Sequence, residues 1–340
     1  MTVGIAHSSL FLSRPNLWLL LSLLWLSIGD ALAAKPKVLV IQSYHAGYEW
    51  QANYSRALHD TLAPLAELEF FEIDSKRLPE VQYRAAADQA WERYQQLGPD
   101  LVIIGDDNAL QLLGPKLATT ATPVVYLGIN NNPRHYLPSR PDNISGVLER
   151  PLLRRSILHL HRLLNGSLKR VLVLFDNGTT SRTVWEEEFA SMPSRQVGPV
   201  HAQIELLGDY GRWQQTVEQA KAQGFDAIVI GLYQTLVDEQ GRHVPDQQVI
   251  NWTSEASPLP LFAFWRFAVG PQMTIGGLVL DGYSQGSEAA SIAREVLEGG
   301  NLPVIPQSSG EGRFVFSRSQ LQRWQLALPP SVAEQAVLVP

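Results

Sequence analysis

Polar and aromatic side chains that could contact a small organic molecule follow an apolar run near the start of the chain. The run itself, Val38 to Ile41, is aliphatic and largely β-branched, which predicts a short strand buried on both faces in a parallel sheet. The residues after it include Ser43, Tyr44, His45, Tyr48 and Trp50. Because ligands of open α/β sheets bind beyond the carboxyl ends of the strands, this stretch is a candidate wall of a binding site. Taken singly, each ring is more often a core or loop packing residue than a ligand contact.

A second group of candidates, Asp106, Asp107 and Asn108, stands between a predicted strand at 101–104 and a predicted helix. Asp and Asn at such a place commonly cap the helix by accepting hydrogen bonds from its first N–H groups. Two carboxylates at a strand end could also hold the ammonium group or the hydroxyls of a ligand. We expect Asp107 to be the capping residue, and either aspartate could face a ligand.

The apolar runs occur twice in the same order, which indicates two similar halves. Segment 37–44 is echoed by 170–177, segment 100–105 by 226–231, and segment 122–127 by 258–263. Helical spacing of apolar residues predicts helices at 51–62, 81–97, 108–117, 152–164, 182–190, 213–223 and 287–297. Strands that alternate with helices build mostly parallel sheets, so the predicted fold class is α/β with two Rossmann-like lobes.

The remaining candidates follow later strands or lie near a crossing between the lobes. They are Asn130, Asp176, Asn177, Thr179, Tyr233, Gln234, Trp265 and Asp281. Those after the predicted strands at 171–174 and 227–230 echo the first-lobe candidates in position, so a bridging ligand would meet them from the opposite side. Asn177 precedes a glycine, which is equally good turn chemistry.

The expected organisation divides each lobe between two segments of the chain. We expect a signal peptide at 1–33, a first lobe at 34–130 plus 277–300, and a second lobe at 145–265 plus 303–340. The chain would cross between the lobes near 130–145, 265–277 and 300–316, and the first crossing is predicted from a run rich in Asn, Pro and Ser. Three extended crossings would form a hinge.

Composition and the N-terminal run predict an exported protein. The formal net charge of -6 and the lack of any Lys/Arg-rich run argue against a nucleic-acid partner. The apolar run Leu17 to Ile28 follows Arg14 and ends shortly before Ala33, as in a secretory signal, so we expect cleavage after Ala33 and a periplasmic location. An uncleaved anchor is the alternative. The sequence has no cysteine, which removes lipoprotein anchoring and any disulfide or thiolate metal site.

Four segments together carry a resemblance to a known fold: 43–50, 99–108, 123–130 and 144–149. With them, the chain resembles the type 1 periplasmic-binding-protein fold over roughly residues 37–328. More narrowly, it resembles the bacterial substrate-binding proteins of ABC transporters, whose relatives also serve as extracellular sensor domains of signalling kinases. The resemblance implies capture of a small organic solute between two lobes that close on it.

The function expected from this resemblance is binding without catalysis. The protein would act as a monomer without a cofactor and would deliver its solute to a membrane ABC permease. Because no kinase or membrane segment follows in this chain, transport is favoured over direct signalling. The alternative within binding proteins is a secreted ligand-sensing partner of a membrane receptor.

One motif suggests an enzyme instead. Gly282 to Gly286 matches the G-x-S-x-G elbow of α/β-hydrolases, which would make Ser284 a nucleophile. In that fold an acid and then a histidine follow the serine, but no His or Asp follows Ser284 here. A helix entry with Ser284 or Ser287 near its cap explains the motif better, and a serine hydrolase is the less favoured alternative.

A metal site is not expected. His159 and His161 are two residues apart on a predicted helix and so face different ways. His45 could approach Asp106 or Asp107, but no second histidine has suitable spacing.

Overall fold

The computed structural model describes residues 1–4, 34–137, 139, 141–150, 152–308 and 312–340. The chain divides into two units, Met1–Lys35 and Pro36–Pro340, and the folded part is the second unit. Most of the expected signal peptide lies outside the described residues, so its cleavage stays a prediction. No helix in the described part of the chain is long and apolar enough to cross a membrane.

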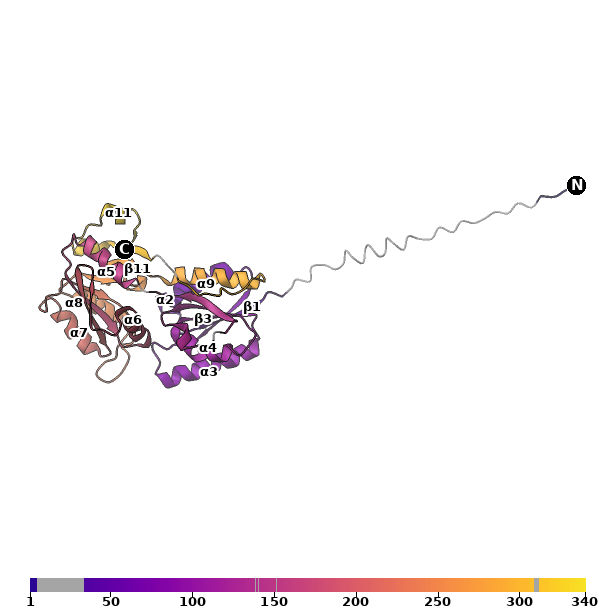
Figure 1. Cartoon of the computed structure of the whole chain (residues 1–340), viewed down its shortest axis with the longest axis horizontal. Helices are drawn as coiled ribbons and strands as arrows, with labels where there is room; N and C mark the ends of the chain where they lie inside the picture. The colour runs from indigo at the N-terminus through magenta and orange to yellow at the C-terminus, as the bar shows by residue number, and fades with distance from the viewer. Residues whose placement is uncertain (5–33, 138, 140, 151, 309–311) are drawn as a thin grey trace. The chain divides into compact units, whose positions relative to one another are not determined.

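The first lobe is built on a six-stranded parallel sheet in the order β12-β5-β4-β3-β1-β2. Its strands are β1 (Lys37–Gln42), β2 (Glu67–Glu72), β3 (Leu101–Gly105), β4 (Val124–Ile129), β5 (Ile144–Leu148) and β12 (Gln307–Ser308). Helices α2 (Glu49–Leu62) and α9 (Gly282–Leu297) cover one face, and α3 (Glu80–Leu97) and α4 (Asp106–Leu117) cover the other (Figure 1).

Strand β1 shows why this sheet needs both layers of helices. Alternate residues of a strand point to opposite faces. Val40 belongs to the same buried cluster as Leu58 of α2, whereas Ile41 belongs to a second cluster with Leu110 of α4. All four side chains are essentially inaccessible to solvent. The run predicted to be apolar on both faces is therefore buried on both faces.

The second lobe contains a five-stranded sheet in the order β10-β9-β6-β8-β7. Its strands are β6 (Arg170–Asp176), β7 (Ser194–Val197), β8 (Val200–Leu207), β9 (Ala227–Ile230) and β10 (Leu261–Ala263), and only β7 runs antiparallel to its neighbour. The helices of this half are α5 (Leu153–Leu163), α6 (Thr179–Phe189), α7 (Tyr210–Gln219) and α8 (Asp246–Ala256).

The two sheets repeat one topology. The order β4-β3-β1-β2 in the first corresponds to β10-β9-β6-β8 in the second, so each echoed pair of segments occupies equivalent strands. The predicted α/β class with two Rossmann-like lobes and mostly parallel sheets is confirmed. In both lobes the first strand of the repeat is an interior strand of its sheet. Residues that follow these two strands, Tyr44 and Thr180, contact each other between the lobes.

A third, smaller sheet joins the later crossings. It has the order β11-β13-β14 and contains β11 (Gly276–Val279), β13 (Arg313–Ser317) and β14 (Val337–Val339), with β13 antiparallel to β11. The short elements around it are the 3-10 turns η1 (Pro133–His135) and η2 (Arg266–Ala268) and the helices α10 (Arg318–Arg323) and α11 (Pro330–Ala333).

Pairing of the strands moves two of the predicted boundaries. Strand β5 pairs with β4 in the first sheet, so the first crossing follows Leu148 rather than lying at 130–145. Strand β11 pairs with β13 in the small sheet, not with the first-lobe sheet, although α9 after it packs against α2 as expected. The Asn- and Pro-rich run 130–143 is thus a loop within the first lobe. Strand β12, which falls within the predicted second-lobe segment 303–340, pairs with β5 of the first-lobe sheet. The remaining lobe limits stay predictions.

The glycines of the G-x-S-x-G motif explain the close contact of α9 with α2. A Cβ on Gly282 would lie 2.3 Å from the carbonyl oxygen of Trp50, and one on Gly286 would lie 2.5 Å from that of Tyr54. Only glycine leaves room for the two helix backbones at these points. The motif is therefore a helix-packing feature of the first lobe.

Most predicted helices are present with boundaries shifted by a few residues. Helices α4, α6 and α9 begin at Asp106, Thr179 and Gly282, earlier than the predicted starts at 108, 182 and 287. Strands β2 and β8 and helix α8 were not predicted. Both strands carry half-exposed residues, which makes them weakly apolar in the sequence.

Candidate functional site

A small cavity lies where the two lobes meet. Residues of the first lobe, the second lobe and the crossings line it: Tyr44, Tyr48, Trp50, Lys76, Asp106, Asn130, Glu149, Thr180, Leu232, Trp265 and Phe267. Its volume of about 10 Å³ is close to the least that holds one water molecule. We call it the inner cavity. Aromatic rings and ionisable groups together make up most of its wall.

Asp106 is one of the two carboxylates that line this cavity. The indole N–H of Trp50 donates to Asp106 Oδ1 at 2.9 Å, while Oδ2 is buried and has no hydrogen-bond partner among the described residues. Asp106 has φ 70°, a left-handed conformation that only Gly, Asn and Asp adopt readily. Gly128 opposite has no Cβ, which would lie 2.7 Å from Asp106 Oδ1. The hydrogen bond from Trp50, the left-handed backbone of Asp106 and the space left by Gly128 together fix the position of this carboxylate.

Glu149 is the second carboxylate of the inner cavity. Its Oε1 accepts from Trp265 Nε1 at 2.6 Å and its Oε2 accepts from Asn130 Nδ2 at 2.9 Å. Asn130 Oδ1 is buried without a partner among the described residues. The bond from Trp265 joins the end of β5 to the second crossing. Two acceptor atoms at the cavity, from Asp106 and Asn130, therefore lack a donor.

Burial changes the acidity of both carboxyl groups. Burial raises the pKa of Glu149 to about 7. Burial, followed by the charges of Glu149 and Asp107, raises the pKa of Asp106 well above its usual range. Both shifts arise because the charged form loses water and faces like charges. A donor or a cation placed among these groups would favour their ionised forms.

Lys76 brings a positive charge into the same space. Its side chain is 9% exposed, and its Nζ lies 4.5 Å from the ring centre of Tyr44 and 5.1 Å from that of Tyr48. Burial lowers its pKa, while the charges of Asp176, Asp106 and Glu149 oppose that shift. The ammonium group rests on two aromatic faces, as in cation–π contacts.

The lobes touch directly at the inner cavity. Tyr44 Oη lies 3.3 Å from Thr180 Oγ1, and either hydroxyl can donate. Phe267 of the second crossing packs its ring 5.3 Å from that of Tyr48 and 6.2 Å from that of Trp265. The aromatic wall is therefore shared between the first lobe and a segment that leads to the second.

A larger cleft adjoins the inner cavity on the outer side. It has a volume of about 880 Å³ and shares Tyr44, Lys76, Thr180 and Leu232 with the inner cavity. Asn108, Asp176, Asn177 and Thr179, all candidates from the sequence, lie along it. We call it the outer cleft.

Asp176 organises the second-lobe side of the outer cleft. Its Oδ1 accepts from Gly178 N and Ser181 Oγ at the start of α6, and its Oδ2 accepts from Thr235 N at 3.0 Å. The carboxylate is 1% exposed. It therefore ties the loop after β6 to the loop after β9.

Two first-wall candidates have structural roles instead. Ser43 Oγ donates to Gly105 O and accepts from Ala109 N at 2.9 Å, so it caps the start of α4 from a neighbouring strand. Asp107 does not cap α4, whose N-cap residue is Gly105. The prediction that Asp107 is the capping residue is wrong.

The carboxylate of Asp107 braces the loop after β4 instead. It accepts from the backbone N–H groups of Asn130 and Asn131 and from Tyr136 Oη, each at 3.1 Å. These bonds are possible because α4 starts at Asp106, which turns the next side chain toward β4. Asp107 thus holds Asn130 at the cavity without lining it.

Three further candidates lie beside the site rather than on its wall. Tyr233 is buried behind Phe267, with ring centres 6.1 Å apart. Gln234 accepts from Tyr233 N through Oε1, and its buried Nε2 has no partner among the described residues. His45 is partly exposed near Tyr48, and burial lowers its pKa. None of these residues contributes to the lining of the inner cavity or the outer cleft.

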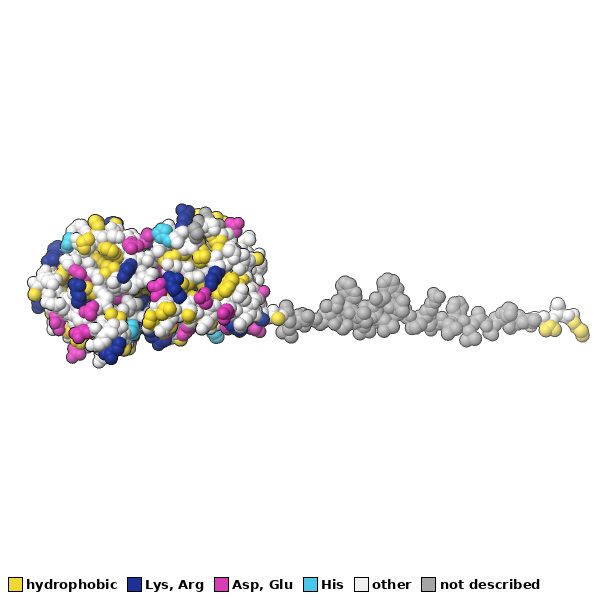
Figure 2. Space-filling model, turned by 90° about the horizontal axis from the view of Figure 1, so that it is seen from below, with side chains coloured by type: hydrophobic (Ala, Val, Ile, Leu, Met, Phe, Trp, Pro, Cys, Tyr) yellow, Lys and Arg dark blue, Asp and Glu magenta, His cyan; other side chains and the backbone are white. Residues whose placement is uncertain are grey.

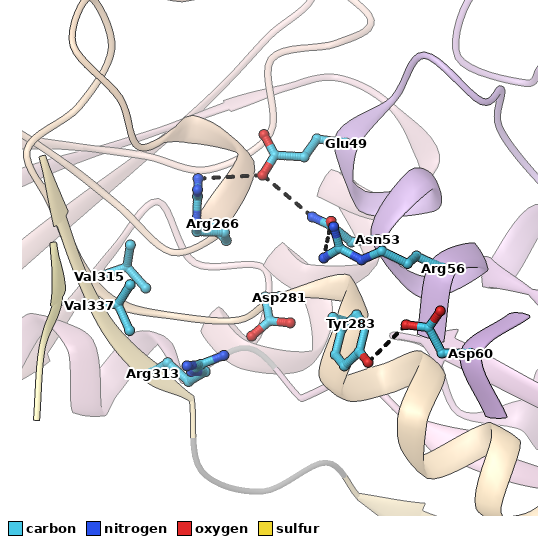
Figure 3. Close-up of a pocket in the computed structure, with 10 residues that line it drawn as sticks. All are labelled: Glu49, Asn53, Arg56, Asp60, Arg266, Asp281, Tyr283, Arg313, Val315 and Val337. Atoms are coloured by element: carbon cyan, nitrogen blue, oxygen red, sulfur yellow. Dashed lines mark hydrogen bonds and ion pairs between the residues drawn. The ribbon is translucent and has the colours of Figure 1, made fainter. Parts of the chain in front are cut away.

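Asp281 lies in a separate groove (Figure 3). This groove, of about 540 Å³, runs between α2, the start of α9 and the small sheet, and Asp281 points into it with Arg313 nearby. The ion pair of Glu49 with Arg266, at 3.4 Å, crosses it. Asp281 Oδ1 accepts from Ser284 N at 3.0 Å and so caps α9. Both carboxylate oxygens of Asp281 thus accept hydrogen bonds from Ser284, and Asp281 lines neither the inner cavity nor the outer cleft.

The geometry of Ser284 fits a helix cap as well. Its hydroxyl donates to Asp281 Oδ2 at 3.2 Å, and no described imidazole forms a hydrogen bond with it. For metals, no group of three His, Asp or Glu side chains within the described ranges is arranged to hold an ion.

Lys76, Glu149, Thr180, Leu232 and Phe267 line the inner cavity but were not predicted. Lys76 stands in a turn between β2 and α3, where a lysine normally points into water. Glu149 belongs to segment 144–149, one of the four that carry the fold resemblance. Its place directly after a buried strand was the signal that could have found it. Thr180 is one residue from the predicted Thr179, which the start of α6 turns outward.

Solved structures with the same fold are known. One is an ABC domain in complex with L-Trp from Streptococcus pneumonia, with 17% identity, a TM-score of 0.66, and coverage of 90% of this chain and 100% of that chain. A conserved domain protein from Vibrio cholerae has 18% identity, a TM-score of 0.65 and the same coverage. A ligand-free, open substrate-binding protein with adhesive properties from Clostridium difficile has 13% identity, a TM-score of 0.63, and coverage of 89% and 99%.

The sequence itself matches no protein-family model and no curated protein. At these identities the likeness concerns the fold. The fold is that of type 1 periplasmic binding proteins, as the sequence resemblance implied. Sheets, topology and lobe arrangement agree with that class over nine-tenths of the chain.

Proposed function

We propose that this protein captures a small organic solute between its two lobes in the periplasm and delivers it to an ABC-type permease. The single observation that carries the proposal is the inner cavity, where both lobes and the second crossing contribute side chains to one aromatic and charged wall. A site divided in this way is complete only when the lobes are together. Binding is therefore coupled to closure.

The free acceptors limit the chemistry of the solute. Asp106 Oδ2 and Asn130 Oδ1 are buried and accept no hydrogen bond from any described residue, and leaving such atoms unpaired costs free energy. A solute with an ammonium group or with hydroxyls would supply those donors. The rings of Tyr48, Trp50 and Trp265 would cover its apolar part. The expected solute therefore has hydrogen-bond donors at one end and an apolar or planar group at the other.

The size of the inner cavity requires movement before a solute enters. A volume of about 10 Å³ cannot contain an organic molecule, so the lobes must separate or side chains must leave. The outer cleft already gives access from solvent to Tyr44 and Thr180, the two residues in contact across the lobes. Opening would proceed from that side.

Mass spectrometry of the purified protein tests the proposal. The protein is unfolded in denaturant, and the released small molecules are compared with those from a variant that carries Asp106→Asn. We expect a compound enriched with the parent protein and depleted with the variant. Identical small-molecule profiles, together with no binding in calorimetry of the compounds found, would argue against solute capture. If an enriched compound is found, pull-down of the protein loaded with it from membrane fractions would identify the permease.

A further inference from the structure

The side chain of Lys76 occupies the inner cavity in an arrangement typical of a bound cation. Its ammonium group lies over the rings of Tyr44 and Tyr48, 4.5 and 5.1 Å from their centres. It forms no ion pair with any carboxylate in the described part of the chain. Yet Asp176, Asp106 and Glu149 all act on it electrostatically. An ammonium group on aromatic faces among carboxylates is how proteins hold cationic ligands.

We propose that Lys76 is a tethered occupant of the solute's cation subsite: its ammonium group lies where the ammonium group of a cationic solute binds, and the solute displaces it. This rests on the proposed solute-binding function and names the class of solute, an organic amine that is charged at neutral pH. Lys76 would then determine specificity by competition, since neutral solutes lack the charge needed to replace it.

The anchoring of the turn that carries Lys76 supports this arrangement. Ser75 N donates to Ser43 O at 2.8 Å, and Asn108 Nδ2 donates to Ser75 Oγ at 2.7 Å. Asp74 N donates to Tyr44 O at 3.1 Å. The backbone beside Lys76 is thus fixed to the ends of β1 and α4, and only the long side chain is left to move.

Charge balance favours a cationic solute over an anionic one. The wall of the inner cavity contains two carboxylates, Asp106 and Glu149, against the single ammonium group of Lys76. Its unpartnered atoms, Asp106 Oδ2 and Asn130 Oδ1, are acceptors. An anion would lie against both carboxyl groups and would leave both acceptors unpaired, whereas an amine supplies a charge that favours their ionised forms and also supplies the donors.

The volumes of the inner cavity and the outer cleft also support the displacement of Lys76. Lys76 lines both the inner cavity and the outer cleft, so its side chain stands between them. With Lys76 inward the inner cavity has about 10 Å³, while the outer cleft has about 880 Å³ to receive a displaced side chain. Removing the side chain beyond Cβ should open a space that fits the lost atoms, which together have the composition of a propylammonium ion.

The test uses propylammonium chloride as the probe and the melting temperature as the readout, with sodium chloride at equal concentration as the reference. Lys76→Ala should show a saturable rise in melting temperature, with half-saturation roughly at millimolar concentration for so small a ligand. The parent protein and Lys76→Met, whose neutral side chain refills the space, should show none. Lys76→Ser repeats the measurement should Lys76→Ala not fold.

Lys116 offers a matched control. Its Nζ also lies over an aromatic ring, 5.8 Å from the centre of Trp91, but it is 41% exposed and pairs with Asp88 at 2.9 Å. Lys116→Ala should therefore show no response to propylammonium. An equal response of Lys116→Ala and Lys76→Ala would overturn the proposal. So would the absence of a response in both Lys76→Ala and Lys76→Ser.

A second probe distinguishes the opposite role for Lys76. Were Lys76 the counter-ion of an anionic solute, propionate would raise the melting temperature of the parent protein and not of Lys76→Ala, and that result would overturn the cation subsite. Propylammonium binding by Lys76→Ala supports the subsite even in a protein that retains no solute during purification. The probe experiment therefore tests the subsite separately from the mass-spectrometric test of solute capture.

Discussion

The indole N–H of Trp50 donates to Asp106 Oδ1 at 2.9 Å, and the other carboxylate oxygen of Asp106 is buried without a hydrogen-bond partner among the described residues. The two residues come from α2 and α4, which cover opposite faces of the first sheet. They meet only beyond its carboxyl edge. The most informative substitutions are therefore those that alter one oxygen of Asp106 and leave the other.

Asp106→Asn should weaken solute binding by about ten- to a hundredfold, since one charge-assisted hydrogen bond is worth on the order of 1–3 kcal/mol. The variant keeps an oxygen for Trp50, and Asn adopts the left-handed backbone of this position readily. The ligand-free melting temperature should therefore change by only a few degrees. Titration calorimetry with the co-purified compound and a thermal melt measure the two effects. Unchanged affinity would remove Asp106 from the site.

Asp107→Asn is the matched contrast. Asp107 accepts three hydrogen bonds that fix the loop after β4, and an amide in its place turns one acceptor atom into a donor. Stability should fall by about 1–3 kcal/mol, because a buried donor is left facing another donor. Denaturant unfolding measures this loss. A variant as stable as the parent protein would show that Asp107 does not brace the loop.

Stability of the ligand-free protein should fall as pH rises from about 4.5 to about 7. The folded protein raises the pKa of Glu149 to about 7, so the folded state binds more protons than the unfolded state in this window. The raised pKa of Asp106 acts in the same direction. The Glu149 shift corresponds to roughly 3 kcal/mol at 1.36 kcal/mol per pKa unit.

Denaturant unfolding across this pH range measures the slope, and Glu149→Gln should make it shallower. Lys76, with its lowered pKa, acts in the opposite direction: its contribution to stability rises with pH between its folded pKa and the usual lysine value. Parallel stability curves for the parent protein and Glu149→Gln would contradict the assignment of this slope to Glu149.

Ser284→Ala and Gly286→Ala should separate the two readings of the G-x-S-x-G motif. Ser284→Ala removes one partly exposed hydrogen bond, so solute binding should stay within error and stability should change by about 1 kcal/mol or less. Gly286→Ala places a Cβ against the backbone of Tyr54 and should destabilise the protein strongly. Thermal melts compare them. Labelling of Ser284 by a fluorophosphonate probe would instead support a hydrolase.

Export predicts a defined mature N-terminus. Because the apolar run is short and Ala31 to Ala33 provide a small-residue cleavage site, the exported protein should begin at Ala34. Intact-mass analysis of protein from the periplasmic fraction checks this. Retention of Met1 would indicate an uncleaved anchor.

The duplicated strand pattern was readable because buried parallel strands are continuous apolar runs. The segments beginning at Lys37 and Arg170 are equivalent interior strands of the two sheets. Strands β2 and β8 were not predicted because one side of each is partly exposed, so neither is a continuous apolar run in the sequence. The boundary after β4 was misplaced because the Asn- and Pro-rich loop there returns to the same sheet, a choice that depends on tertiary pairing.

The sequence analysis named part of the lining of the inner cavity and did not name Lys76 or Glu149. Tyr44, Tyr48, Trp50 and Asp106 were named because polar and aromatic residues after a strand are unusual. Lys76 was missed because nothing local distinguishes a buried lysine from a solvated one. The surface adds no simple guide, since Lys and Arg side chains lie among Asp and Glu side chains on the face in Figure 2 rather than in one patch.

The central claim, that a solute is captured by closure of the two lobes, is tested most directly by a distance measured between them. The chain has no cysteine, so Ala85→Cys on α3 and Glu218→Cys on α7, both exposed, give two unique spin-labelling sites. Pulsed electron paramagnetic resonance would record the distance distribution after the co-purified compound is removed and again after it is restored. We predict a broad distribution without the compound and a shorter, narrower one with it. The same distribution in both states, with binding verified by calorimetry, would contradict closure.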